Sequence, residues 1–253
     1  RAGVTNPRVS SATRAQAASN WKVNAHIERR TAGGAWVQVG ARDAGAQPIS
    51  GLKFGGRLER PPDKRADLAV ELNDPKLKQA CETLWRDVMD TKMYVTAGLG
   101  PSASNEGFTF DYDLPNESAY AETCASVALI FWAQRMLHLD LDGKYADVLE
   151  QSLFNNTLCG LSREGEHYFY SNPLEDDGSH SRWAWHTCPC CTMNVSRLIA
   201  SVGGYFVSHA DDAIAFHLYG GISTTVDLKS AKGALRDVSS YPWSGDLKIH
   251  VEP

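Results

Sequence analysis

Several features that would place this 253-residue chain in other classes of protein are missing from it. No apolar run approaches the roughly 18 to 20 residues of a membrane-spanning helix, so we expect no membrane partner. The formal net charge of -5 gives no reason to expect nucleic acid as a partner. Six cysteines are too few for a disulfide scaffold in a chain this long. No signal peptide opens the chain, which favours a cytoplasmic location, and the start at Arg1 suggests a fragment.

The positive charge that the chain does carry is concentrated at its start. Residues 1–60 hold ten Lys and Arg against three Asp and Glu, whereas the remainder holds fifteen against twenty-seven. The first segment has no sustained apolar face, only weak alternation that fits short strands at 21–26 and 35–40. We therefore predict an atypical N-terminal region over residues 1–64 that is disordered or mispredicted, a helical domain over 65–210 and a β domain starting at 211.

Apolar periodicity predicts helices in the middle of the chain and strands at its end. Asp74 and Pro75 form a helix start, with a cap residue followed by proline. The run 127–132 is apolar on nearly every side and predicts a deeply buried helix. Further helices are expected at 145–158 and 191–209, and strands at 166–170, 214–219, 222–226 and 247–251. Helices followed by strands indicate a mainly α domain and then a β domain.

Three cysteines fall within four positions, at Cys188, Cys190 and Cys191. Adjacent helical residues point about 100° apart, so neighbouring sulfurs converge on one atom only at a turn or helix start. Thiolates are soft ligands that favour zinc, which usually takes four ligands. Buried small hydrophobic residues or a strained vicinal disulfide are the alternatives.

The segment Glu122-Thr-Cys124 supplies the two further ligands that such a zinc ion would need. Positions i and i+2 on a regular helix lie about 200° apart, so both can reach one metal only where the backbone is extended or turning. We therefore expect the buried helix to begin after Cys124. The residue types predict zinc on Glu122, Cys124, Cys190 and Cys191, with Cys188 as an alternative ligand.

Four separate motifs carry a resemblance to a known family. Residues 106–116 (EGFTFDYDLPN), 119–125 (AYAETCA), 169–175 (FYSNPLE) and 188–194 (CPCCTMN) resemble the β-L-arabinofuranosidases of glycoside hydrolase family 127, and the related family 146 is similar. The resemblance runs from about residue 65 to the end of the chain. It implies a partial (α/α)6 barrel with the start of a β-sandwich domain.

The resemblance also implies a mechanism. It makes the protein a retaining glycoside hydrolase that releases L-arabinose from β-L-arabinofuranosides, with zinc as cofactor. Cys190 would be both nucleophile and zinc ligand, Glu122, Cys124 and Cys191 the other ligands, and Glu106 the acid/base. The aromatic neighbours of Glu106 could desolvate it and raise its pKa; they are Phe108, Phe110 and Tyr112.

Aromatic residues and a histidine flank these motifs and are candidates for binding the sugar, although core packing explains each of them equally well. They are Tyr168, Tyr170, Trp185 and His186. The expected partners are an arabinofuranoside-containing glycan and a second copy of the chain in a homodimer.

One departure from the family lies near the front. The family usually carries a Gly-His-Ala-Val-Arg-like motif, whereas this chain has Gly51-Leu-Lys-Phe-Gly-Gly-Arg57, without the histidine. Two other functions therefore stay open, a non-catalytic fragment stabilised by zinc and, less in keeping with the motifs, a thiol redox protein that uses Cys190 and Cys191.

Overall fold

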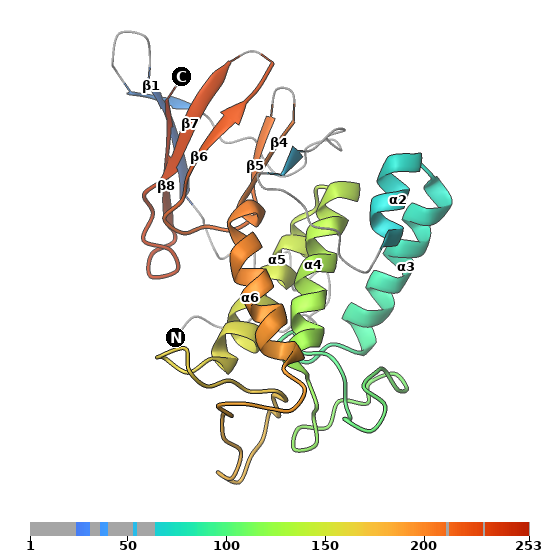
Figure 1. Ribbon diagram of the computed structural model, residues 1–253. Helices are drawn as coiled ribbons and strands as arrows, with labels where there is room; N and C mark the ends of the chain where they lie inside the picture. Colours follow the sequence, from blue (N-terminus) through green and yellow to red (C-terminus); the bar gives the residue numbers. More distant parts are fainter. Residues whose placement is uncertain are drawn as a thin grey trace. The chain divides into compact units, whose positions relative to one another are not determined.

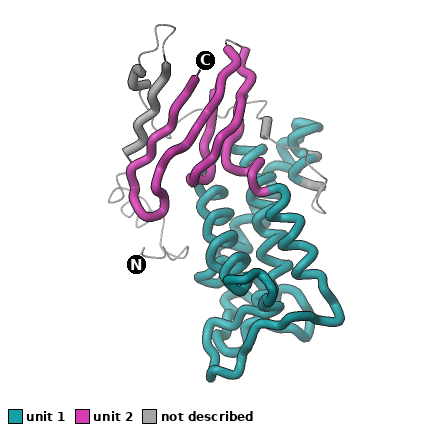
Figure 2. The backbone as a smooth tube through the Cα atoms, turned by 60° about the vertical axis from the view of Figure 1, so that its left-hand side comes forward, with its two compact units in different colours: residues 1–8, 58–201 teal, residues 9–57, 202–253 magenta. Residues whose placement is uncertain are grey.

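The computed structural model describes residues 24–30, 36–39, 53–54, 64–210, 213–229 and 231–252 (Figure 1). The chain divides into two compact units, with a boundary between Ser201 and Val202 (Figure 2). Most of the predicted N-terminal region lies outside the described residues, so its assignment stays a prediction. Over the described ranges, none of the helices has the length and hydropathy to cross a membrane.

The first unit is helical, and its described residues begin with α2 (Lys64–Leu72) and α3 (Pro75–Thr91). Asp74 caps α3 as the sequence predicts, because its carboxylate accepts hydrogen bonds from the backbone N–H groups of Lys76 (2.8 Å) and Leu77 (3.5 Å). The remaining α-helices are α4 (Thr123–Leu139), α5 (Gly143–Ser152) and α6 (Cys190–Val202). A π-helical turn (Leu153–Thr157) and a 3-10 turn (Leu158–Gly160) continue α5.

Helix α4 is the buried helix that the apolar run predicts. It packs against α2 and α5, and its residues Leu129, Ile130 and Met136 are at most 1% exposed. The buried guanidinium of Arg135 is compensated, since it donates to the Phe131 carbonyl (3.1 Å) and the Gln134 side chain (2.8 Å). A rigid α4 gives the residues at its N-terminus a fixed position.

The second unit consists of two sheets. The larger has the order β2-β1-β8-β7-β6 and the smaller β3-β4-β5. Neighbouring strands are antiparallel except for β1 and β8, which are parallel. The strands are β1 (Asn24–Arg30), β2 (Trp36–Val39), β3 (Lys53–Phe54), β4 (Val207–Ala210), β5 (Ala213–Phe216), β6 (Ser223–Asp227), β7 (Lys232–Asp237) and β8 (Asp246–Glu252).

Side chains of both sheets meet in one apolar cluster, as in a β-sandwich. Val207 of β4 lies in it together with Val226 of β6 and Leu235 of β7. The mainly α then β class is therefore confirmed. Strands β1 and β2 overlap the short strands expected at 21–26 and 35–40, and β3 is a further strand before the helices.

Three local predictions are wrong. Residues 166–170 form no strand, because Tyr168 pairs only through isolated bridges to Leu161 and Trp183. The helix predicted to reach residue 209 ends at Val202, where two glycines follow and β4 begins. The buried helix starts at Thr123, one residue before Cys124.

Candidate metal and catalytic site

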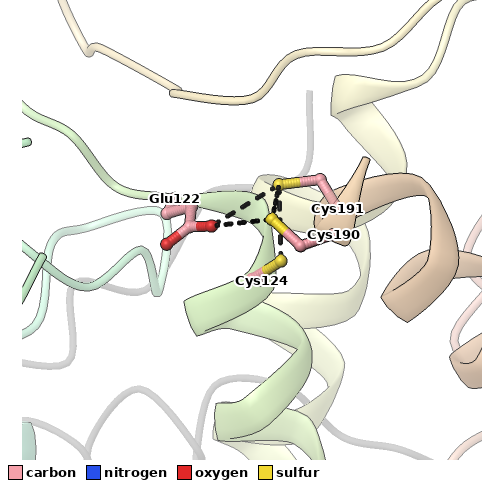
Figure 3. Close-up of side chains that lie close together, drawn as sticks. All are labelled: Glu122, Cys124, Cys190 and Cys191. Atoms are coloured by element: carbon pink, nitrogen blue, oxygen red, sulfur yellow. Dashed lines mark hydrogen bonds between the residues drawn. The ribbon is translucent and has the colours of Figure 1, made fainter. Parts of the chain in front are cut away.

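Four ligand atoms from Glu122, Cys124, Cys190 and Cys191 lie within 4.8 Å of one another (Figure 3). The Cys191 Sγ atom is 3.4 Å from that of Cys124 and 3.9 Å from that of Cys190. The Glu122 Oε1 atom is 3.5 Å from the Cys190 sulfur and 3.7 Å from the Cys191 sulfur. The structure thus brings together the four residues that the sequence proposes as ligands.

Two helix starts create this convergence. Glu122 precedes α4 with an extended backbone (ψ 136°) and makes no side-chain cap, so its carboxylate is available to the cluster. Cys124 follows in the first turn of α4, and Cys190 and Cys191 are the first two residues of α6. This is the helix-start geometry that adjacent ligands require.

The segment before Glu122 is held in an unusual conformation. Ala121 has a positive φ of 36°, and its N–H donates to the Gly100 carbonyl (2.9 Å). Its carbonyl accepts hydrogen bonds from the side chains of Asn156 (3.2 Å) and Asn172 (2.9 Å). These contacts, which come from distant parts of the chain, set the direction in which Glu122 leaves the backbone.

Gly98 is required for this packing, and its replacement supplies a stability test. A Cβ atom at Gly98 would lie 2.8 Å from the Asn156 Oδ1 atom and 3.0 Å from the Ala121 Cβ atom. We expect Gly98→Ala to lower the free energy of unfolding by about 1–3 kcal/mol in urea titrations, because neither neighbour can move without breaking the contacts at Ala121.

Gly143→Ala is the matched control, because nothing lies within 4 Å of the added methyl group at that exposed helix start. We expect it to leave stability unchanged or raise it by up to about 1 kcal/mol. Equal stability of the two variants would show that the loop carrying Gly98 is not tightly packed.

Four of the six distances among these atoms fit those around a tetrahedral ion. With metal–sulfur bonds near 2.3 Å and a metal–oxygen bond near 2.1 Å, a tetrahedron has sulfur–sulfur edges of about 3.8 Å and sulfur–oxygen edges of about 3.6 Å. The observed edges of 3.4 and 3.9 Å between sulfurs and of 3.5 and 3.7 Å to oxygen lie close to these values. The four residues therefore form a candidate metal site.

The electrostatics of the cluster also favour a cation. Burial raises the pKa of the Cys190 thiol to about 12, and the hydrogen bond with Cys124 raises the pKa of Cys191. The pKa of Cys124 is lowered, chiefly by its hydrogen bond with Cys191. Three crowded thiols beside a carboxylate cannot all ionise at neutral pH unless a positive charge joins them.

Neighbouring polar groups support two of the sulfurs. The Asn194 side-chain N–H donates to the Cys124 Sγ atom (3.1 Å), and the Tyr170 hydroxyl lies 3.3 Å from the Cys190 Sγ atom. The pKa of Tyr170 is raised, first because of its hydrogen bond with Cys190. Tyr170 therefore keeps its proton and can donate it in a hydrogen bond to the sulfur.

Glu106 and two of the four candidate ligands line the same cavity. This mostly apolar cavity of about 540 Å³ is lined by Glu106 and Tyr120 together with Glu122 and Cys124. The Tyr120 hydroxyl donates to the Glu106 Oε1 atom at 3.0 Å. A substrate in this cavity would lie beside the Glu106 carboxyl group and the edge of the candidate metal site formed by Glu122 and Cys124.

A sequence model of the β-L-arabinofuranosidase GH127 catalytic domain matches residues 56–204, which is more than half of the chain. The chain belongs to this GH127 family. A curated relative, the non-reducing end β-L-arabinofuranosidase of Bifidobacterium longum, is 39% identical over 192 residues. That match covers 71% of this chain and 29% of the relative.

Solved structures of GH127 (α/α)6-barrel enzymes agree with the fold. A β-L-arabinofuranosidase from Geobacillus stearothermophilus T6 superposes with a TM-score of 0.72 at 44% identity, over 75% of this chain and 32% of that one. A second GH127 β-arabinofuranosidase gives 0.71 at 36% identity, over 74% and 30%. This GH127 chain thus spans about a third of the length of the relatives it matches, and the partial barrel inferred from the motifs is confirmed.

The sequence-predicted sugar contacts lie in different surroundings in this GH127 chain. The ring centroids of Tyr170 and His186 are 4.9 Å apart, and the His186 ring stacks on that of Trp183 with centroids 4.6 Å apart. Because Tyr170 contacts Cys190, these three rings form an aromatic group beside that sulfur. Trp185 is 67% exposed, whereas Tyr168 is buried at 4%. Cys188 is exposed and lies outside the set of four ligands.

The surroundings of Glu106 differ from the sequence expectation. Phe110 and Tyr112 are 74% and 62% exposed, and Glu106 itself is exposed, so this aromatic segment does not bury the carboxylate. Sequence reasoning also missed Tyr120 and Asn194. Tyr120 lies two residues before a ligand and Asn194 three after one, and that proximity was the one available signal.

Proposed function

We propose that this chain carries the nucleophile, the acid/base and the metal site of a retaining β-L-arabinofuranosidase. The observation that supports this most is the convergence of three sulfurs and a carboxylate beside a cavity that Glu106 also lines. Family membership supports the substrate class, an arabinofuranoside-containing glycan. The names of the relatives state the same activity for the longer proteins.

Zinc is the ion that we propose for the site, held by Glu122, Cys124, Cys190 and Cys191. Three sulfur donors and one oxygen at tetrahedral spacing suit zinc better than the oxygen-seeking calcium or magnesium. When bound, zinc keeps coordinating thiols deprotonated at neutral pH. Without the ion, the raised pKa values of Cys190 and Cys191 would keep these thiols protonated.

The residues then divide the reaction into two displacements. The Cys190 sulfur attacks the anomeric carbon and forms a C–S bond while the glycosidic C–O bond breaks, and Glu106 gives its proton to the departing oxygen. Water then attacks the same carbon, Glu106 takes a proton from it, and the C–S bond breaks to return the Cys190 thiolate. Two inversions yield L-arabinose with retained configuration.

The test is hydrolysis by the full chain of two β-L-arabinofuranosides, one with a 4-nitrophenyl and one with a methyl leaving group. Release of L-arabinose with initial retention supports the proposal. We expect Glu106→Gln to lower kcat/KM for the methyl glycoside by about 10² or more and for the aryl glycoside much less, because an activated leaving group needs less protonation.

Glu117→Gln, on the same connecting segment and exposed, is the control and should behave as wild type. An equal loss for both glycosides in Glu106→Gln would contradict the acid/base role. A folded, metal-loaded chain that hydrolyses neither glycoside would instead support a non-catalytic protein stabilised by zinc.

A further inference from the structure

The Tyr120 hydroxyl contacts the carboxyl group that the proposed chemistry makes the acid/base. It donates to the Glu106 Oε1 atom at 3.0 Å, and its ring centroid lies 6.0 Å from that of Tyr170. The Tyr170 hydroxyl is in turn 3.3 Å from the Cys190 sulfur. A tyrosine hydroxyl thus contacts each of the two proposed catalytic groups, and the two rings are neighbours.

Little else holds Glu106 in place. Its residue is exposed, and its backbone takes the left-handed conformation with φ 46°. Among the residues that the structure describes, its carboxylate accepts one hydrogen bond, from the Tyr120 hydroxyl. An exposed glutamate without such a partner samples several rotamers, and only some of them bring its proton to the leaving oxygen.

Tyr120, in contrast, is held firmly. It is 8% exposed and lies between Ala119 and Ala121, which are 4% and 0% exposed. Its carbonyl accepts a hydrogen bond from the Asn172 N–H (3.0 Å). A fixed donor therefore meets an acceptor that has freedom to move.

We propose that Tyr120 is the positioning residue of Glu106 and selects the oxygen that transfers the proton. Because Oε1 accepts the tyrosine hydrogen bond, the exchangeable proton resides on Oε2. That proton goes to the glycosidic oxygen as the C–O bond breaks and the bond to Cys190 forms, and Oε2 later takes a proton from water. This inference rests on the proposed function and adds to it a residue that never gives up its own proton.

The experiment compares Tyr120→Phe with wild type in the full chain loaded with zinc. We expect kcat/KM for methyl β-L-arabinofuranoside to fall about 10- to 100-fold, mainly through kcat, because general acid catalysis is worth roughly 10² to 10⁴. The 4-nitrophenyl glycoside should lose less than about 3-fold. In the Glu106→Gln background the same change should add little, because the two residues act together.

Tyr94→Phe is the matched control. Tyr94 is 2% exposed, packs in one cluster with Ala119 and Ala121, and its buried hydroxyl has no hydrogen-bond partner in the described part of the chain. Removal of that hydroxyl leaves Glu106 untouched, so both glycosides should be hydrolysed at wild-type rates. A merely structural effect of Tyr120→Phe would lower both glycosides equally, and that result would overturn the inference, as would no change at all.

Failure of the proposed function has a different signature. A wild-type chain that hydrolyses neither glycoside refutes the function, and the positioning role is then decided by amide hydrogen exchange. We expect Tyr120→Phe, and not Tyr94→Phe, to speed exchange in residues 105–108 several-fold, because their side-chain anchor is lost. Unchanged exchange there would overturn the positioning role.

Discussion

Replacement of Cys190 by Ser is expected to abolish hydrolysis, with kcat/KM for the 4-nitrophenyl glycoside falling by about 10³ or more. The sulfur of Cys190 lies within 3.5 Å of Glu122 and 3.3 Å of the Tyr170 hydroxyl, in the first turn of α6. A serine hydroxyl is a far weaker nucleophile at neutral pH, and its oxygen suits a thiolate-rich zinc site poorly. Steady-state kinetics with both glycosides measures the loss.

Two measurements separate this loss from misfolding. Circular dichroism and a cooperative thermal transition should show that the variant keeps its fold, because Cys190 is only half-buried, although the Tm falls as zinc binding weakens. Cys159→Ser makes the same chemical change at an exposed thiol outside the ligand set and should keep full activity. If the Cys190 variant retained more than about a tenth of wild-type activity, another nucleophile would have to carry the reaction.

Removal of the metal is the second large effect that we expect. A strong chelator should abolish activity and lower the Tm by about 8–16 °C. This follows because an ion present at 1,000 times its Kd adds about 4 kcal/mol to stability, and each kcal/mol shifts the Tm of a domain this size by about 2–4 °C. The proposed ion would join α4 to α6, so its removal would leave the Cys124 and Cys191 sulfurs in a weak contact at 3.4 Å.

The identity and ligands of the ion are measured in the same samples. Elemental analysis should give close to one zinc per chain, and X-ray absorption should show three sulfurs near 2.3 Å and one oxygen. Glu122→Gln should weaken binding, whereas Glu164→Gln, at an exposed loop position, should not. A spectrum with only nitrogen and oxygen neighbours, or a chain that is stable and active without stoichiometric metal, would refute the site and favour thiol redox chemistry.

The sequence alone carried those parts of the fold and site that depend on near neighbours. Two adjacent cysteines require a helix start, and Asp74 followed by Pro75 caps a helix through its own next residues. Alternating apolar residues within 214–219, 222–226 and 247–251 likewise predict the strands β5, β6 and β8. The pairing of Glu122 and Cys124 with Cys190 and Cys191 also followed from residue types, because few other side chains offer such ligands.

Structural features that depend on residues far apart in the chain could not be predicted from local sequence patterns. The stretch 166–170 alternates like a strand, yet Tyr168 meets only single residues of two different segments and forms no ladder. Strand β1 pairs in parallel with β8, more than two hundred residues later, and no local pattern records that partner. Helix α2 was overlooked because only its packing against α3 and α4 stabilises it.

The sequence by itself thus determined which residues can hold a metal, which helices begin beside it and which family the chain belongs to. Tertiary structure alone decided that Glu106 shares a cavity with Glu122 and Cys124, that Tyr120 is its hydrogen-bond donor and that Ala121 takes a left-handed backbone. The physical reason is the separation along the chain of the residues that interact. Ligand chemistry and helix capping are properties of residues a few positions apart, whereas the direction of a side chain on a loop is set by the packing of segments that meet only after folding.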